Sequence, residues 1–75
     1  MRNISIGNTY RHFKGSLYTV ITVAEHTETN EQLVIYSDIV TGNIYARPFE
    51  MFNSKVDRNK YPNTTQEYRF EQVIV

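Results

Sequence analysis

Five aromatic and basic side chains occupy positions from which they could form one binding surface. On the alternating pattern of a strand, Tyr10 and His12 share one face of a first strand, and Tyr45 and Arg47 share one face of a later strand. Tyr36 lies on a strand between these two. Rings beside a guanidinium group typically pack on proline-rich or methylated side chains or stack on bases. The set predicts a ligand-binding groove, and Arg47 is its most informative member because it is the lone cation of an acidic stretch, residues 25–50.

The same residues also have a purely structural interpretation. A small core needs its aromatic residues, and tyrosines commonly pack the ring inside with the hydroxyl at the rim. We therefore expect the tyrosines to divide between core and surface and His12 to be a hydrogen-bonded structural residue. Under this interpretation Arg47 forms an ion pair with Glu50 or Asp38.

Catalytic and metal-binding patterns are weak. The chain has no cysteine, its serines lack a nucleophile context, and its three glycines form no phosphate-binding loop. His12 and His26 are the only histidines, so a metal site would need both, meeting across neighbouring strands and joined by Asp38 or a glutamate. A barrel this small also leaves little room for an enzyme pocket of about 300 Å³ or more. We expect no enzyme, no catalytic residue and no cofactor, and keep a histidine metal protein as a third alternative.

Composition narrows the class of partner. Seventy-five residues make one domain, residues 1–75, and the formal net charge is zero, which argues against strong nonspecific binding to nucleic acids or membranes. Arg11 and Lys14 together offer only a weak phosphate contact. The chain has no apolar run long enough for a transmembrane helix and no hydrophobic signal core at its start. With the lack of cysteine, this predicts a cytoplasmic protein.

Strand signals dominate the chain. β-Branched and aromatic residues, bounded by turn residues, predict strands over 9–13, 17–26, 32–39, 44–47 and 68–75. The segment Ile4-Ser5-Ile6 also alternates, and is expected to pair with the last strand. Both faces of the second strand carry apolar residues, which predicts a bulge or strong bend near Val20-Ile21.

Two segments depart from this pattern. Residues 48–53 suit a single helical turn with Pro48 at its first position, and Phe49 and Phe52 on one side as a cap on the core. Residues 53–66 are polar and irregular, and are expected to be the least ordered part or a loop that orders on binding.

Together these features predict an all-β fold, a small SH3-like barrel of about five strands with one short helical turn, with an OB-fold as the alternative. The favoured function is a noncatalytic binding module that recognises a protein segment, or a single-stranded nucleic acid more weakly, through Tyr10, His12, Tyr36, Tyr45 and Arg47. The alternative is a homo-oligomeric assembly protein, because the apolar edge Gln72-Val73-Ile74-Val75 needs a partner strand. The chain is therefore expected to be a monomer or a homodimer without membrane contact.

The spacing of several blocks resembles the small bacterial domain of unknown function numbered 1653. The matching blocks are Gly7-x-x-Tyr10-x-His12-Phe13-Lys14-Gly15-x-x-Tyr18-x-Val20, Ala24-x-His26-x-Glu28-Thr29, Leu33-Val34-x-Tyr36, Tyr45-Ala46-Arg47-Pro48-x-x-Met51-Phe52-x-x-x-Val56 and Arg69-Phe70-Glu71. Residues 57–68 do not match clearly. The resemblance implies a compact SH3-like β-barrel and no established activity.

Overall fold

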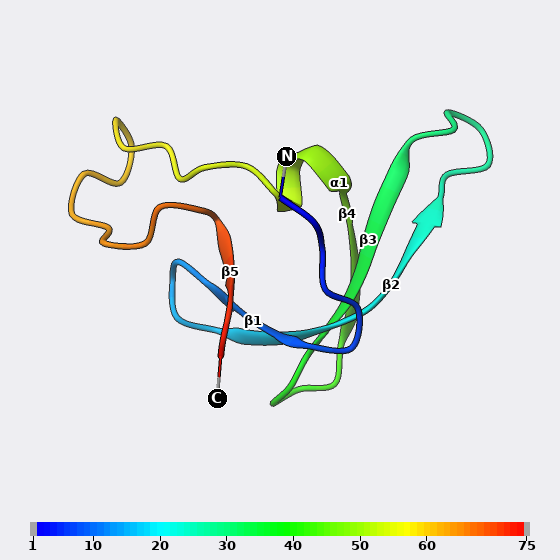
Figure 1. Cartoon of the computed structure of the whole chain (residues 1–75), viewed down its shortest axis with the longest axis horizontal. Helices are drawn as coiled ribbons and strands as arrows, with labels where there is room; N and C mark the ends of the chain where they lie inside the picture. Colours follow the sequence, from blue (N-terminus) through cyan, green and yellow to red (C-terminus); the bar gives the residue numbers. More distant parts are fainter. Residues whose placement is uncertain (1, 75) are drawn as a thin grey trace.

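The protein folds as one five-stranded antiparallel sheet with a short helix, in a computed structural model that describes residues 2–74 (Figure 1). The elements are β1 (Thr9–His12), β2 (Leu17–Glu25), β3 (Gln32–Asp38), β4 (Ile44–Pro48), α1 (Phe49–Phe52) and β5 (Phe70–Gln72). The order across the sheet is β4-β3-β2-β1-β5. The predicted all-β fold with about five strands and one helical turn is confirmed.

The sheet curls without closing into a barrel. β4 and β5 are its two edges and share no ladder of hydrogen bonds. The curl nevertheless brings these edges close, because the Arg47 guanidinium on β4 lies 5.7 Å from the ring centroid of Phe70 on β5. Side chains, rather than backbone pairing, thus span the opening between the edges.

A β-bulge bends β2 where the sequence predicts it. The register with β3 pairs Val20 with Tyr36 and then Thr22 with Ile35, so Ile21 is the extra residue. The bulge moves the inward-facing positions by one: Val20 is fully buried, whereas Ile21 and Thr22 are both exposed. This explains why apolar residues occur on both faces of the segment under strict alternation.

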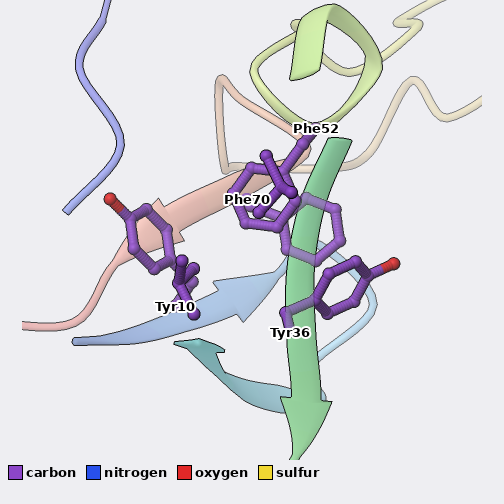
Figure 2. Close-up of a cluster of buried hydrophobic side chains, with 6 residues drawn as sticks. Tyr10, Tyr36, Phe52 and Phe70 are labelled. Atoms are coloured by element: carbon purple, nitrogen blue, oxygen red, sulfur yellow. The ribbon is translucent and has the colours of Figure 1, made fainter. Parts of the chain in front are cut away.

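The core is a cluster of rings beneath the curled sheet. Phe52 and Phe70 stack with their centroids 4.1 Å apart, and Tyr10 and Tyr36 pack their ring edges against this pair (Figure 2). Val20 and Val34 complete the buried cluster. Full burial of such side chains contributes roughly 1.5–3 kcal/mol each, which matters in a chain this short.

α1 carries Phe52, the central ring of this cluster. Pro48 ends β4 and takes the position before the helix, rather than the first helical position that the sequence predicts. Phe52 is fully buried and Phe49 packs against the core from the same side, as predicted. No helix in residues 2–74 has the length and apolar character needed to cross a membrane.

The predicted partner of the last strand is wrong. β5 pairs with β1, through Tyr10 opposite Gln72 and His12 opposite Phe70, and residues 4–6 form no strand. Hydrogen bonds to Tyr10 and Val20 hold the segment before β1 in an irregular path, with Ser5 N–H donating to the Tyr10 hydroxyl. β5 is also shorter than the predicted 68–75, and Val75 lies outside the described residues.

The segment between α1 and β5, residues 53–69, which we call the polar loop, is tied to the sheet at its base. Lys55 and Tyr68 form an isolated bridge, the Val56 N–H donates to the Glu67 carbonyl, and the Arg69 N–H donates to the Ser54 carbonyl. Val56 is buried. The loop projects from one end of the molecule, opposite the tip of the β2–β3 hairpin (Figure 1).

Candidate functional site

Two of the five predicted site residues belong to the core. Tyr10 is 3% exposed and Tyr36 4% exposed, and their hydroxyls point out of the cluster in different directions (Figure 2). Tyr10 accepts a hydrogen bond from Ser5 N–H at 2.8 Å, and Tyr36 accepts one from Arg47 Nε at 3.2 Å. Both are packing residues with satisfied hydroxyls, as the structural interpretation of the tyrosines predicts, and neither is among the residues that line the cleft described below.

Tyr45 is exposed but is not among the residues that line the cleft described below. It lies directly opposite Tyr36 across the β3–β4 ladder, and its ring centroid is 5.8 Å from that of Tyr36. It is 43% exposed, and its hydroxyl accepts from the Asn43 side chain at 3.4 Å.

The remaining two residues, His12 and Arg47, meet in a cleft of about 310 Å³. We call it the cationic cleft. Its lining residues come from the β1–β2 turn, from β4 and from the polar loop: His12, Phe13, Lys14, Arg47, Asp57, Lys60, Tyr61 and Arg69. The sequence predicts little room for an enzyme pocket of about 300 Å³. This cleft reaches that volume because the polar loop supplies one of its walls.

One wall of the cationic cleft is the turn between β1 and β2. The Gly15 N–H donates to the His12 carbonyl and the His12 N–H donates to the Ser16 carbonyl, which closes a tight turn. Gly15 has a φ of +108°, a conformation that favours glycine. His12 Nδ1 accepts the Lys14 N–H at 3.1 Å, so this histidine also orders the turn.

The polar loop forms the facing wall. The Asp57 carboxylate accepts the backbone N–H groups of Asn59 and Lys60, an arrangement that sets the turn before Tyr61. The Tyr61 ring then packs on Phe13, with centroids 4.8 Å apart. This contact joins the loop to the turn.

Sequence reasoning missed five members of the cleft: Phe13, Asp57, Lys60, Tyr61 and Arg69. The pairing of a lysine with a tyrosine before Pro62 was a weak signal within the loop. Nothing local placed that loop against the β1–β2 turn, because the contact depends on how β5 brings the chain back beside β1.

Positive charge is concentrated in the cleft. Four of the eight lysine and arginine residues line it, against one of the eight acidic residues. Within residues 2–74 the structure has one ion pair, between Lys55 and Glu67 at 3.5 Å, and it lies outside the cleft. Arg47 therefore forms neither of the ion pairs expected under the structural interpretation, with Glu50 or with Asp38.

The two arginines are each held by one nitrogen. Arg47 Nε donates to the Tyr36 hydroxyl at 3.2 Å, and Arg69 Nε donates to Ser54 Oγ at 3.4 Å. The two terminal nitrogens of each guanidinium group make no hydrogen bond within residues 2–74. Each planar group is thus anchored while its outer fork remains open.

The positive charges of the cleft contribute to lowered pKa values of two of its ionisable groups, His12 and Tyr61. Burial, with a further contribution from the charges of Arg47, Arg69 and Lys14, lowers the pKa of His12 from its ordinary value of 6.5 to about 4. For Tyr61, desolvation raises the pKa of the phenol, but hydrogen bonding by Lys14 and the charges of Lys14 and Lys60 outweigh it and lower the pKa. The lowered pKa of His12, due first to burial and then to three cations, and the lowered pKa of Tyr61 both agree with a site that favours negative charge.

The two histidines do not meet. His12 lies at the end of β1 beside the start of β2, whereas His26 follows the end of β2 at the hairpin tip. A span of nine strand residues is about 30 Å. Within residues 2–74 no three histidine, cysteine or carboxylate side chains are grouped so as to hold a metal ion.

Comparison with known proteins identifies a family. The model described as "Protein of unknown function (DUF1653)" matches residues 8–72, a range that includes every residue of the cationic cleft. No curated protein and no solved structure matches the chain. Because the match spans most of its 75 residues, the chain belongs to the DUF1653 family of proteins of unknown function.

Proposed function

We propose that this chain is a small noncatalytic binding module that holds an acidic protein segment in the cationic cleft. The observation that carries the proposal is the gathering of Lys14, Arg47, Lys60 and Arg69 around one cleft with a single carboxylate, Asp57. One oxygen of that carboxylate, Oδ1, already accepts two backbone N–H groups of its own loop. A negatively charged ligand would neutralise the excess positive charge of the cleft.

The aromatic side chains support a binding role. The Phe13 ring of the β1–β2 turn packs against the Tyr61 ring of the polar loop. The ammonium groups of Lys14 and Lys60 lie 5.3 Å and 5.6 Å from the Tyr61 ring centroid. Rings beside cations provide both apolar contact and charge, a combination found in sites that bind peptide segments. Of the residues predicted from sequence, His12 and Arg47 remain in the proposed site, and Tyr10, Tyr36 and Tyr45 leave it.

We place the module in the cytoplasm as part of this proposal, because a chain without cysteine is typical of a reducing compartment. The partner is a protein rather than a nucleic acid, because a chain of zero net charge lacks the general attraction that nucleic-acid binding uses.

A charge-reversal pair tests the proposal. Lys14 and Arg11 are both exposed, lie three residues apart, and differ in that only Lys14 lines the cleft. An isotope-labelled sample is titrated with a hexaglutamate peptide and, as a neutral control, a hexaglutamine peptide, while amide shifts are followed by NMR. We expect hexaglutamate alone to shift residues of the cleft, and Lys14→Glu to weaken binding at least several-fold more than Arg11→Glu. Equal weakening by both variants would show that only net charge matters and would refute a specific site.

A second candidate is self-assembly through the free edges of the sheet. β5 is an edge strand, and Ile74 beyond it is 89% exposed; at the other edge Ile44 is 66% exposed. Such edges are templates for pairing with a second copy. Light scattering at about 100 μM, well above the dissociation constant of a stable dimer, should then give twice the monomer mass, and Ile74→Lys should return it to the monomer. A monomer at that concentration rules this candidate out.

A further inference from the structure

We infer that the group recognised in the cationic cleft is a phosphate monoester carried on a protein side chain. This inference rests on the proposed function and narrows it from acidic segments in general to phosphorylated ones. It depends on the geometry of the two guanidinium groups, on the amount of uncompensated charge, and on the disposition of the other basic residues.

The guanidinium groups keep available the nitrogens that phosphate recognition uses. Arg47 and Arg69 both line the cleft and are held through Nε, by Tyr36 and Ser54 respectively, and within residues 2–74 their terminal nitrogens make no hydrogen bond. A guanidinium group binds phosphate with two parallel N–H···O bonds, and a group already oriented loses less side-chain entropy on doing so. The anchors come from β3 and from the base of the polar loop, so two separate elements hold the two forks beside the same cleft.

The charge of the cleft exceeds what one carboxylate neutralises. Lys14, Arg47, Lys60 and Arg69 against Asp57 leave three formal positive charges, with His12 neutral. A glutamate would compensate one of these charges, whereas a phosphate monoester carries about 1.5 to 2 negative charges at pH 7 and three acceptor oxygens. The exposed Lys14 and Lys60 line the same cleft and would supply charge for the oxygens that the arginines leave free.

The basic residues outside the cleft favour a protein ligand over a nucleic acid. Arg2 stacks on the Tyr68 ring at 3.6 Å and donates to the Phe70 carbonyl, Arg58 donates to the Gln66 carbonyl, and Lys55 pairs with Glu67. Three of the four remaining cations are thus engaged within the fold. A single-stranded nucleic acid is bound along a positively charged track with successive stacking rings. Apart from the exposed Arg11, the basic side chains not engaged within the fold gather at one cleft, which suits a single phosphate group on a neutral or mixed chain.

Three matched peptides test the inference. An acetylated and amidated pentapeptide, Gly-Gly-Xaa-Gly-Gly, is prepared with phosphoserine, glutamate or serine at the centre and titrated into the labelled protein. A phosphotyrosine version and the dinucleotide dT-dT form two further arms. We expect the phosphoserine or the phosphotyrosine peptide to bind at least about tenfold more tightly than the glutamate peptide, a difference of about 1.4 kcal/mol, with the serine peptide inactive. The comparison of the two phosphopeptides shows which side chain carries the phosphate.

Each other outcome has a definite meaning. Equal binding of the phosphopeptides and the glutamate peptide overturns the phosphate inference and leaves the proposed acidic-segment function standing. Tighter binding of the dinucleotide than of either phosphopeptide overturns the choice of a protein ligand. No shifts with any peptide, with hexaglutamate included, overturn both proposals.

A double variant locates the binding. Lys14→Ala with Lys60→Ala removes two exposed ammonium groups and leaves both arginine anchors in place, so the fold should persist, as the amide spectrum will show. The matched control is Arg11→Ala with Lys55→Ala, which removes the same charge outside the cleft. We expect the first pair to lower the affinity for the phosphopeptide at least tenfold and the control pair to lower it less than threefold. Equal losses would place the phosphate elsewhere and overturn the inference.

Discussion

Arg47 on β4 donates through Nε to the hydroxyl of Tyr36 on β3, across 3.2 Å and eleven residues of sequence. The two side chains lie diagonally across the ladder, because Tyr36 is opposite Tyr45 and Arg47 is opposite Val34. The ring of Tyr36 is part of the core, and its hydroxyl holds the Arg47 side chain at the cleft. One side chain therefore links the packing of the core to the geometry of the cationic cleft.

Removing that hydroxyl should loosen the site without emptying the core. In Tyr36→Phe the ring still fills its place, but the Arg47 guanidinium loses its fixed partner. We expect the free energy of unfolding to fall by about 0.5–1.5 kcal/mol and the affinity for an anionic peptide to fall several-fold. Urea denaturation measures the first effect and NMR titration the second.

Tyr10→Phe is the matched control for this experiment. Its hydroxyl accepts from Ser5 N–H, away from the cleft, and its ring is equally buried. It should lose a similar amount of stability and keep its affinity. If both variants lose affinity to the same extent, the hydrogen bond between Tyr36 and Arg47 has no special role.

The stacked pair of phenylalanines should carry much of the stability. Phe52 and Phe70 stack at 4.1 Å and are 0% and 1% exposed. Phe70→Ala should cost about 3–5 kcal/mol, which is comparable to the whole stability of a domain of this size. We expect the variant to be unfolded at room temperature by circular dichroism. Phe70→Leu, which keeps most of the volume, should remain folded with a lower melting temperature; a fully stable Phe70→Ala variant would show that the core lies elsewhere.

Local pattern was sufficient for most of the sheet. The bulge at Ile21 was predictable because apolar residues on both faces of one strand conflict with strict alternation, and α1 was predictable from Pro48 and the spacing of Phe49 and Phe52. Both features are decided by neighbours in sequence. The division of the tyrosines between core and surface also followed, since a core this small must use its large rings.

Long-range pairing was not available from the same patterns. Residues 4–6 alternate as a strand would, but β5 pairs with the free edge of β1. Which segment pairs there depends on the whole fold and not on the local pattern. The cationic cleft could not be predicted for the same reason. Arg69, Lys60 and Tyr61 come close to His12 only when β5 pairs with β1. The predicted groove was also wrong about depth. Alternation places Tyr10 and His12 on one face, but it does not indicate that Tyr10 is buried in the core while His12 lines the cleft.

The bulge gives a sharp contrast between adjacent residues. Val20 is fully buried and Ile21 is 42% exposed although both are β-branched and apolar. We expect Val20→Thr to destabilise the protein by about 1–3 kcal/mol, because it buries a hydroxyl in the core, and Ile21→Thr to change stability by no more than about 0.5 kcal/mol. Chemical denaturation of the two variants checks this. Similar losses in both would mean that Ile21 points inward and that the register shift is misplaced.

Stability should depend on pH through His12. Burial and the charges of Arg47, Arg69 and Lys14 hold the pKa of folded His12 at about 4, against 6.5 as its ordinary value. Asp57, on the facing wall, is the one carboxylate lining the same cleft. Between these two pH values the unfolded chain binds more protons than the folded one, so the free energy of unfolding falls as the pH is lowered toward 4 and is fully retained above about 6.5.

We expect His12 to account for a loss of up to about 1 kcal/mol between pH 7.5 and pH 5.5, after allowance for solvent screening at this partly exposed group. His12→Asn is the control, because the asparagine oxygen can accept the Lys14 N–H in place of Nδ1 without titrating. The pH dependence of this variant should be flatter than that of the natural chain over the same range. Parallel curves would show that the imidazole titrates normally in the folded protein, and that the positive potential of the cleft does not reach it.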